Sequence, residues 1–242
     1  MILKSTRQYP SLTVPFASEF PGWPGHDESR EVLNIEIWSD VVCPWCFIGK
    51  RRLERALAAT GVTDAIITHR AFQLDPSATT EGKRTVDVLA AKYRLDDAGV
   101  QQMMSQVTEV AASEGLNYRL LDGISGNTVL AHRLLLWAQE QGRAQELLEL
   151  LYSAYFEGAK PIFTLDELLP YVTDAGLDAN AARIAMESGA YGAEVESDAE
   201  LARAFGANGV PFFVFDRKYG ISGAQPFEVF VQTIEKSLEA TE

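Results

Sequence analysis

The chain has 242 residues, of which 47% are hydrophobic and 23% are charged, as is usual for a globular protein and unlike a disordered or fibrous one. Its 21 basic residues against 34 acidic ones give a formal net charge of -13. This charge repels phosphate backbones and anionic membrane surfaces, so neither nucleic acid nor a membrane is expected as a partner.

Residues 1–31 mix prolines and glycines in a way that breaks both helical and strand patterns, and we expect a mobile extension there. The start of the chain also lacks the unbroken apolar run of about 7 to 15 residues that a secretory signal needs. We therefore expect a cytoplasmic protein. Because a reducing compartment disfavours structural disulfides, the two cysteines need another explanation.

The first regular pattern predicts a strand, a helix and a second strand. Apolar and polar side chains alternate over residues 32–38, as in a half-buried strand. Helical spacing follows over residues 43–59 and ends at Gly61, and residues 66–74 are typical of a strand. This order implies two parallel strands joined by a right-handed crossover, which is half of an α/β domain.

Helical spacing dominates from about residue 82 to 190, without strand signals, so we expect a separate helical layer or subdomain. The end of the chain returns to α/β patterns. Residues 210–215 (VPFFVF) predict a buried strand, residues 220–223 a turn or short strand, and residues 227–238 a closing helix. We accordingly divide the chain into an extension at 1–31, the first part of the α/β domain at 32–80, a helical insertion at 81–190, and the second part of the domain at 191–242.

The two cysteines, Cys43 and Cys46, are three positions apart, a spacing shared by only about 1% of random position pairs. On a helix this spacing brings Cβ atoms to roughly 5 to 6 Å, close enough for a disulfide to close and reopen. Free N–H groups at a helix start favour a thiolate, so we expect Cys43 to be the attacking nucleophile. We expect Cys46, one turn inward, to be less exposed, to have the higher pKa and to resolve the mixed disulfide.

The residues between the cysteines have two interpretations. Pro44 fits a first helical turn because its missing N–H is not needed there. Pro44 and Trp45 either contact the substrate or serve only in packing, and their place between two redox sulfurs favours substrate contact.

A strand, then CPWC opening a helix, then a helical block and VPFF resemble the DsbA-like thioredoxin-fold family with an inserted helical domain. Within that family, five segments look like the branch named after the frenolicin-biosynthesis oxidoreductase: SDVVCPWCFIGKRRLE, NTVLAHRL, AYFEG, GVPFFVF and SGAQ. The resemblance covers about residues 33–240. It implies an α/β thioredoxin fold with an inserted all-helical subdomain, and a thiol-disulfide oxidoreductase without a cofactor.

The resemblance also implies a cis peptide between Val210 and Pro211, lying against the cysteines and pairing with the substrate chain. Without the family, an ordinary trans proline at a strand edge would be expected. Glu36 matches an acidic position that would accept the proton of Cys46, the alternative being a solvent-facing strand residue. Asn127 and His132 would line the cleft from the helical side, the alternatives being helix capping and a core hydrogen bond.

The expected substrate is a protein or small molecule that carries a disulfide or thiol, with glutathione among the candidates; the oligomeric state stays open. One alternative is a glutathione-dependent transferase or isomerase on the same architecture, although such relatives generally carry serine where Cys43 stands. Another is a non-catalytic metal site or holdase. A metal site is not expected, because the sequence has no second CxxC and no paired histidines at ligand spacing.

Overall fold

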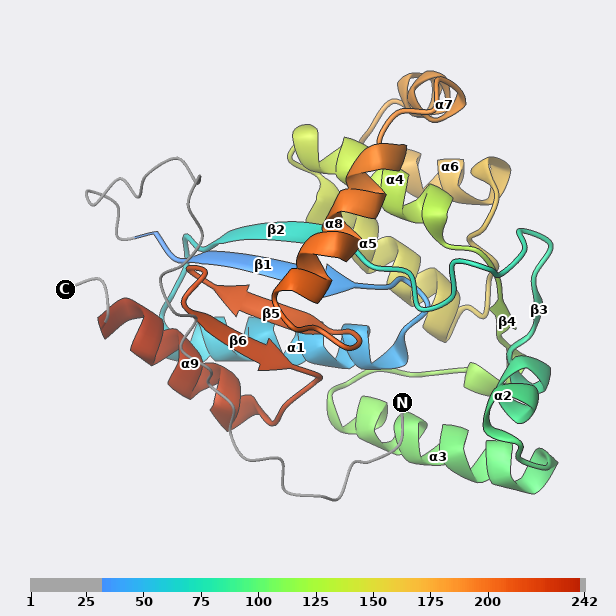
Figure 1. Ribbon diagram of the computed structural model, residues 1–242, viewed down its shortest axis with the longest axis horizontal. Helices are drawn as coiled ribbons and strands as arrows, with labels where there is room; N and C mark the ends of the chain where they lie inside the picture. The colour runs from blue at the N-terminus through green and yellow to red at the C-terminus, as the bar shows by residue number, and fades with distance from the viewer. Residues whose placement is uncertain (1–31, 240–242) are drawn as a thin grey trace.

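A mixed four-stranded sheet organises the computed structural model, which describes residues 32–239 (Figure 1). Its strands, in the spatial order β2-β1-β5-β6, are β2 (Ile66–Ala71), β1 (Asn34–Ser39), β5 (Phe212–Phe215) and β6 (Tyr219–Ser222). Strands β1 and β2 are parallel, whereas β5 is antiparallel to both β1 and β6. The predicted parallel pair is confirmed, and the expected extension at 1–31 lies outside the described residues.

Helix α1 (Pro44–Thr60) connects β1 to β2 and has clear local signals at both ends. Pro44 occupies its first turn, and Gly61 ends it with a φ of 72°, in the left-handed region that favours glycine. Helix α9 (Phe227–Glu239) packs beside α1 (Figure 1). The buried side chains between these helices and the sheet include Ile35 and Phe213.

The opposite face of the sheet is covered by helix α8 (Gly192–Ala204), seen in front of the strands in Figure 1. Trp38 of β1 packs there against Phe205, with ring centroids 5.6 Å apart in an edge-on arrangement. Both faces of β1 are therefore buried, whereas the sequence predicted a strand with one exposed face. The reason is that β1 lies between two other strands with helices on either side.

Most of the insertion is helical, as predicted. Its helices are α2 (Thr85–Tyr93), α3 (Asp97–Ser113), α4 (Val129–Glu140), α5 (Ala144–Tyr152), α6 (Leu165–Asp174) and α7 (Ala179–Glu187), with a 3-10 turn (Leu120–Asp122) and a π-helical turn (Ser153–Glu157). The fold class is confirmed with one correction: β3 (Lys83–Arg84) and β4 (Ile124–Ser125) form a small antiparallel ladder. Two-residue strands are too short to leave a periodic pattern.

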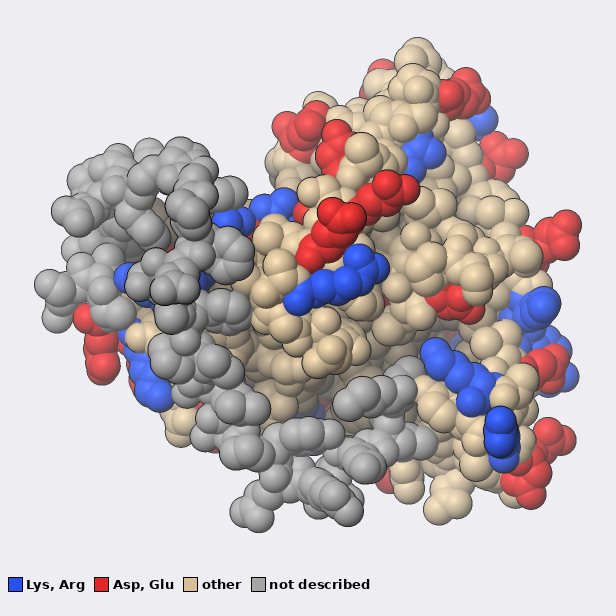
Figure 2. All heavy atoms as spheres, in the orientation of Figure 1, with Lys and Arg blue, Asp and Glu red and all other residues tan. Residues whose placement is uncertain are grey.

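The predicted boundaries at residues 80 and 190 fall in turns, so they cut no helix or strand, and the division itself stays a prediction. No helix within residues 32–239 combines the length and apolarity needed to cross a membrane. On the face shown in Figure 2, the visible basic side chains of the described residues stand in separate groups among acidic ones. They form no continuous basic surface of the kind that binds nucleic acid on that face.

The first turns of α1 lie where the sheet meets the helical insertion. Cys43, Cys46 and Phe47 belong to the same buried cluster as side chains of α4 and α5. The ring of Phe47 stacks on Tyr152 of α5 with a centroid separation of 4.9 Å. The fold thus places the CxxC segment at the junction of its two parts.

Candidate active site

The CxxC segment forms the turn that starts helix α1. The Cys43 N–H donates a hydrogen bond to the Asp40 carbonyl at 3.0 Å, and the Cys46 N–H donates to the Cys43 carbonyl at 2.9 Å. Cys43 is the N-cap residue, with extended backbone angles, and Pro44 follows at the first helical turn. The predicted helix start is therefore observed, with both cysteines in one turn.

Both cysteines are free thiols, and both are buried. Cys43 is 1% exposed and Cys46 is 3% exposed, so the expectation that Cys46 is the less exposed residue was wrong. Side chains of the helical insertion and the Val210 segment pack against Cys43, which buries it as well. Burial and a contact with the Cys43 sulfur raise the pKa of the Cys46 thiol well above its usual value, although the backbone N–H of Asp40 acts in the opposite direction.

The second component of the site comes from a segment 167 residues further along the chain. The peptide bond between Val210 and Pro211 is cis, as the resemblance implied, and the Cys43 thiol donates to the Val210 carbonyl at 3.6 Å. Gly49 of α1 permits this approach, because a Cβ atom there would lie 3.0 Å from the Phe213 ring and 3.2 Å from Pro211. A glycine inside a helix was the available signal of close packing, and our sequence interpretation did not use it.

These elements are those of a known family. Residues 34–235 match the family described as the DSBA-like thioredoxin domain. The chain belongs to this family of thiol-disulfide oxidoreductases. The family resemblance is thereby confirmed, whereas the narrower frenolicin-like branch stays a prediction.

Individual relatives support the assignment of this DsbA-like protein. A probable DsbA oxidoreductase from Streptomyces coelicolor is 41% identical, with a TM-score of 0.81 over 86% of this chain and 90% of that one. The cytosolic disulfide reductase DsbM from Pseudomonas aeruginosa, solved with GSH, has a TM-score of 0.60 over 85% of this chain and 99% of that one; at 18% identity this is a likeness of fold. The Bacillus subtilis protein YwbO is 26% identical over 161 residues, which are 66% of this chain and 74% of that protein.

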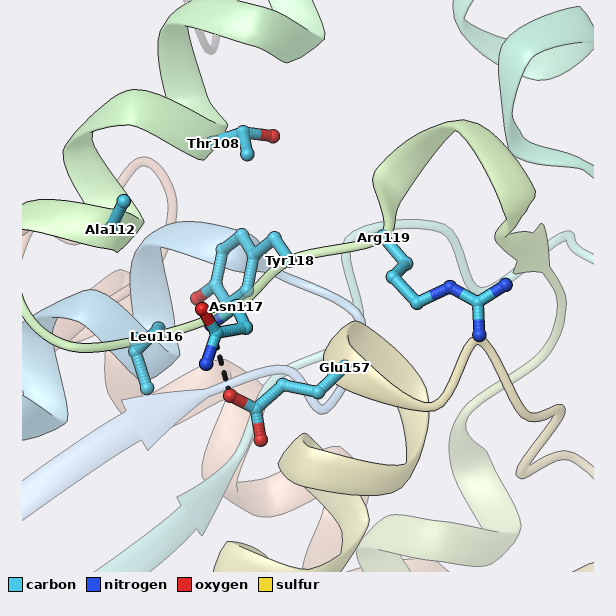
Figure 3. Close-up of a pocket in the computed structure, with 7 residues that line it drawn as sticks. All are labelled: Thr108, Ala112, Leu116, Asn117, Tyr118, Arg119 and Glu157. Atoms are coloured by element: carbon cyan, nitrogen blue, oxygen red, sulfur yellow. Dashed lines mark hydrogen bonds between the residues drawn. The ribbon is translucent and has the colours of Figure 1, made fainter.

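An open groove of about 500 Å³ borders the insertion between α3 and the π-helical turn (Figure 3). Tyr118 lines this groove, and its hydroxyl donates to the Pro44 carbonyl at 2.7 Å. Asn117, also in the lining, donates its N–H to Glu157 at 3.0 Å. Trp45 is half-buried against the same helical cluster. Tyr118 thus links the groove directly to the CxxC turn of the DsbA-like protein, a contact that the sequence did not suggest.

Two further candidates from the sequence, Asn127 and His132, have different surroundings. Asn127 accepts a hydrogen bond from the Val129 N–H at 2.9 Å and donates to the Ala78 carbonyl at 2.9 Å, so it fastens a loop to the start of α4. His132 is 2% exposed, and its Nε2 atom lies 3.3 Å from Oδ1 of Asp40. Both of these atoms lack a well-aligned hydrogen bond within residues 32–239. His132 therefore contacts Asp40, which precedes the CxxC turn, whereas Asn127 holds the loop at Ala78 against the start of α4.

Glu36 is not a solvent-facing residue, since it is only 8% exposed. Its carboxylate accepts hydrogen bonds from Arg70 at 2.7 Å and from Arg217 at 2.7 and 2.8 Å. Burial by itself raises the pKa of Glu36, but the two arginines outweigh burial and hold it below its usual value. The structure thus places Glu36 between two cations, and its action on Cys46 stays a prediction.

His69 of β2 is a titratable group that the sequence interpretation did not single out. It is 5% exposed, and burial lowers its pKa to about 4, with the charge of Lys50 adding to the effect and the Gln145 side chain opposing it. The sequence around β2 gave no sign of this, because histidine is intermediate between the residues that are usually buried and those that are usually exposed.

This burial makes stability depend on pH. Between pH 6.5 and 4 the unfolded chain binds a proton at His69 that the folded chain does not, so stability rises with pH across this window. We expect acidification from pH 6.5 to 4 to lower the free energy of unfolding by about 2 to 3 kcal/mol through this residue. Urea unfolding at several pH values would measure it. His69→Gln should flatten the dependence, and an equal slope in both proteins would contradict the prediction.

Proposed function

We propose that this DsbA-like protein transfers electrons between thiols and disulfides by cycling Cys43 and Cys46 between a dithiol and a disulfide. The observation that supports the proposal is that both sulfurs occupy one helical turn, with Cys43 against the Val210 carbonyl beside the cis proline. The sulfurs carry both electrons themselves, so the reaction needs no cofactor.

As a reductase the protein would act in two steps. The Cys43 thiolate attacks a substrate disulfide, which forms a mixed disulfide and releases the first substrate sulfur as a thiolate. Cys46 then loses its proton and attacks the Cys43 sulfur, which forms the Cys43–Cys46 disulfide and releases the second substrate sulfur. Two electrons pass from the protein dithiol to the substrate, and the same steps in reverse oxidise a substrate dithiol.

Substrate contacts are proposed for Pro44 and Trp45 on one side and for Val210 and Pro211 on the other. The Val210 carbonyl accepts a hydrogen bond from the Cys43 thiol, so a substrate chain that binds along this edge would lie next to the nucleophile. We propose a disulfide- or thiol-bearing protein or small molecule as substrate, with glutathione as one candidate and the cytoplasm as the location. A cytosolic family relative of the same fold, solved with GSH, agrees with this proposal.

The proposed function predicts catalysed reduction of a protein disulfide. With glutathione as the electron donor, the protein should accelerate insulin reduction and should not conjugate glutathione to an electrophilic aromatic chloride. Turbidity and absorbance would follow the two reactions. Conjugation without disulfide reduction would instead favour a transferase. The equilibrium between the Cys43–Cys46 pair and glutathione would then give the reduction potential of the pair, and with it the direction of electron transfer. A reductase has a reduction potential below about -250 mV, and a strong oxidant has one near roughly -120 mV.

A further inference from the structure

A small cavity lies against Cys46, between the sheet and helices α1 and α5. Its volume is about 20 Å³, which exceeds the roughly 10 to 15 Å³ that one water molecule needs. The polar residues of its lining are Ser39, Cys46, Lys50, Glu54, His69, Gln145 and Tyr152. A water molecule needs two to four polar partners, and this lining offers more than that.

His69 gives the clearest sign that the cavity has a ligand. Within the described part of the chain, neither of its ring nitrogens has a well-aligned hydrogen-bond partner, although the residue is only 5% exposed; the nearby Gln145 side chain interacts with the ring but is not well aligned with either nitrogen. A neutral imidazole has one N–H donor and one acceptor nitrogen, and leaving both unsatisfied inside a protein is costly. A bound water would satisfy at least one of them.

The cavity also leads away from Cys46 toward the surface. Cys46 is 3% exposed, whereas the side chains of Lys50 and Glu54, which also line the cavity, are 11% and 42% exposed. None of the residues proposed to contact the substrate lines it. A substrate bonded to Cys43 would therefore leave this route from Cys46 to solvent uncovered.

We propose that this cavity holds one water molecule, bound by His69, that hydrogen-bonds the Cys46 sulfur and carries its proton toward the surface at Lys50 and Glu54. The inference rests on the proposed function, since only a resolving cysteine must release its proton while a substrate covers its partner. His69 is a positioning residue here: it acts through the water and does not touch the reacting sulfurs.

The step balances as follows. The S–H bond of Cys46 and the bond between Cys43 and the substrate sulfur break, and the Cys43–Cys46 bond forms. The substrate sulfur leaves with the electron pair of the broken disulfide. The water takes the proton from Cys46 and passes one of its own outward to solvent, so that no further reactant is needed.

The other ionisable groups around Cys46 do not offer an equivalent route. Cys43 is bonded to the substrate at this stage. Asp40 does not line the cavity: one of its oxygens accepts from the Leu74 N–H at 2.7 Å, and the other lies 3.3 Å from Nε2 of His132. Burial raises the pKa of both Tyr118 and Tyr152, so each stays a neutral phenol. His132 lies beside Asp40, and Lys50 is held by Glu54 and Glu149.

The test uses an aromatic disulfide whose released thiolate is coloured, mixed with the reduced full-length protein. The first release reports attack by Cys43, and the second reports resolution by Cys46. His69→Leu should leave the first phase unchanged and slow the second roughly ten- to hundredfold, because a hydrogen bond to a thiolate changes its pKa by about one to two units. His69→Gln, which can still bind a water, should restore most of the rate.

The matched control is Thr68→Val, since Thr68 neighbours His69 on β2 but faces the other side of the sheet. The thiolate absorbance can be titrated in a Cys43→Ala background, where Cys46 is the remaining cysteine. Adding His69→Leu to this background should raise the Cys46 pKa, whereas adding His69→Gln or Thr68→Val should not. Equal second phases in wild type and His69→Leu, or equal slowing by His69→Leu and His69→Gln, would overturn the proposal. Absence of the first phase in wild type would instead refute the proposed function.

Discussion

Cys43→Ser is expected to reduce disulfide exchange by about 10³-fold or more, whereas Cys46→Ser should still complete the first step. A hydroxyl cannot replace the thiolate that attacks a disulfide, so the Cys43 variant should form no adduct. The Cys46 variant lacks the resolving sulfur and should accumulate a mixed disulfide between Cys43 and the substrate.

Mass spectrometry of each variant after reaction with a disulfide would measure this difference. The chain has only two cysteines, so each variant retains a single thiol and any adduct is assigned without ambiguity. Both substitutions should leave the melting temperature close to that of the reduced wild type, which serves as the folding control. The opposite pattern, with the adduct on Cys46, would reverse the assigned roles.

Glu36→Gln should lower the free energy of unfolding by about 2 to 4 kcal/mol. The change removes the charge that Arg70 and Arg217 share, at a site where the carboxylate is nearly buried. Loss of one partner of a buried ion pair usually destabilises by about 3–5 kcal/mol, but the arginine side chains are 25% and 27% exposed, so water recovers part of the loss. The expected drop in melting temperature is roughly 5 to 15 °C.

Glu146→Gln is the matched control, because Glu146 pairs with Arg143 on the surface of α5, where such a pair contributes less than about 1 kcal/mol. Thermal unfolding would compare the two variants. Kinetics with the coloured disulfide distinguish a role of Glu36 in stability from a role in the reaction. If Glu36 only stabilises the fold, the rate of resolution by Cys46 is unchanged. Slower resolution with unchanged stability would mean that Glu36 is the proton acceptor that the family resemblance implied.

Local signals explain what the sequence could predict. Helix α1 has Pro44 in its first turn and Gly61 at its end, and the chain between them has helical spacing, so its bounds were recoverable from neighbouring residues. The cysteine spacing indicated the redox chemistry for the same reason. The cis bond before Pro211 followed only from the family resemblance, because nothing local distinguishes it from a trans bond.

The missed features depend on residues that meet only in the folded chain. Arg217 is 181 positions from Glu36, and a polar residue on a predicted strand looks exposed until its partners are known. The contact of Asp40 with His132 joins the sheet to the insertion, and the cavity at His69 depends on α5. Periodicity identifies which face of an element is apolar, but it does not tell what covers that face.

The pairing of the first strand with the fifth has a consequence for synthesis of the protein. Ile35 lies opposite Phe215 in the sheet, so this ladder forms only after residue 215 has emerged from the ribosome. Until then Cys43 lacks its neighbour Val210, and an unfinished chain carries the two thiols without the surroundings that direct them. Contacts this distant along the chain slow folding, and here they also make the surroundings of the two thiols depend on synthesis of the chain through β5.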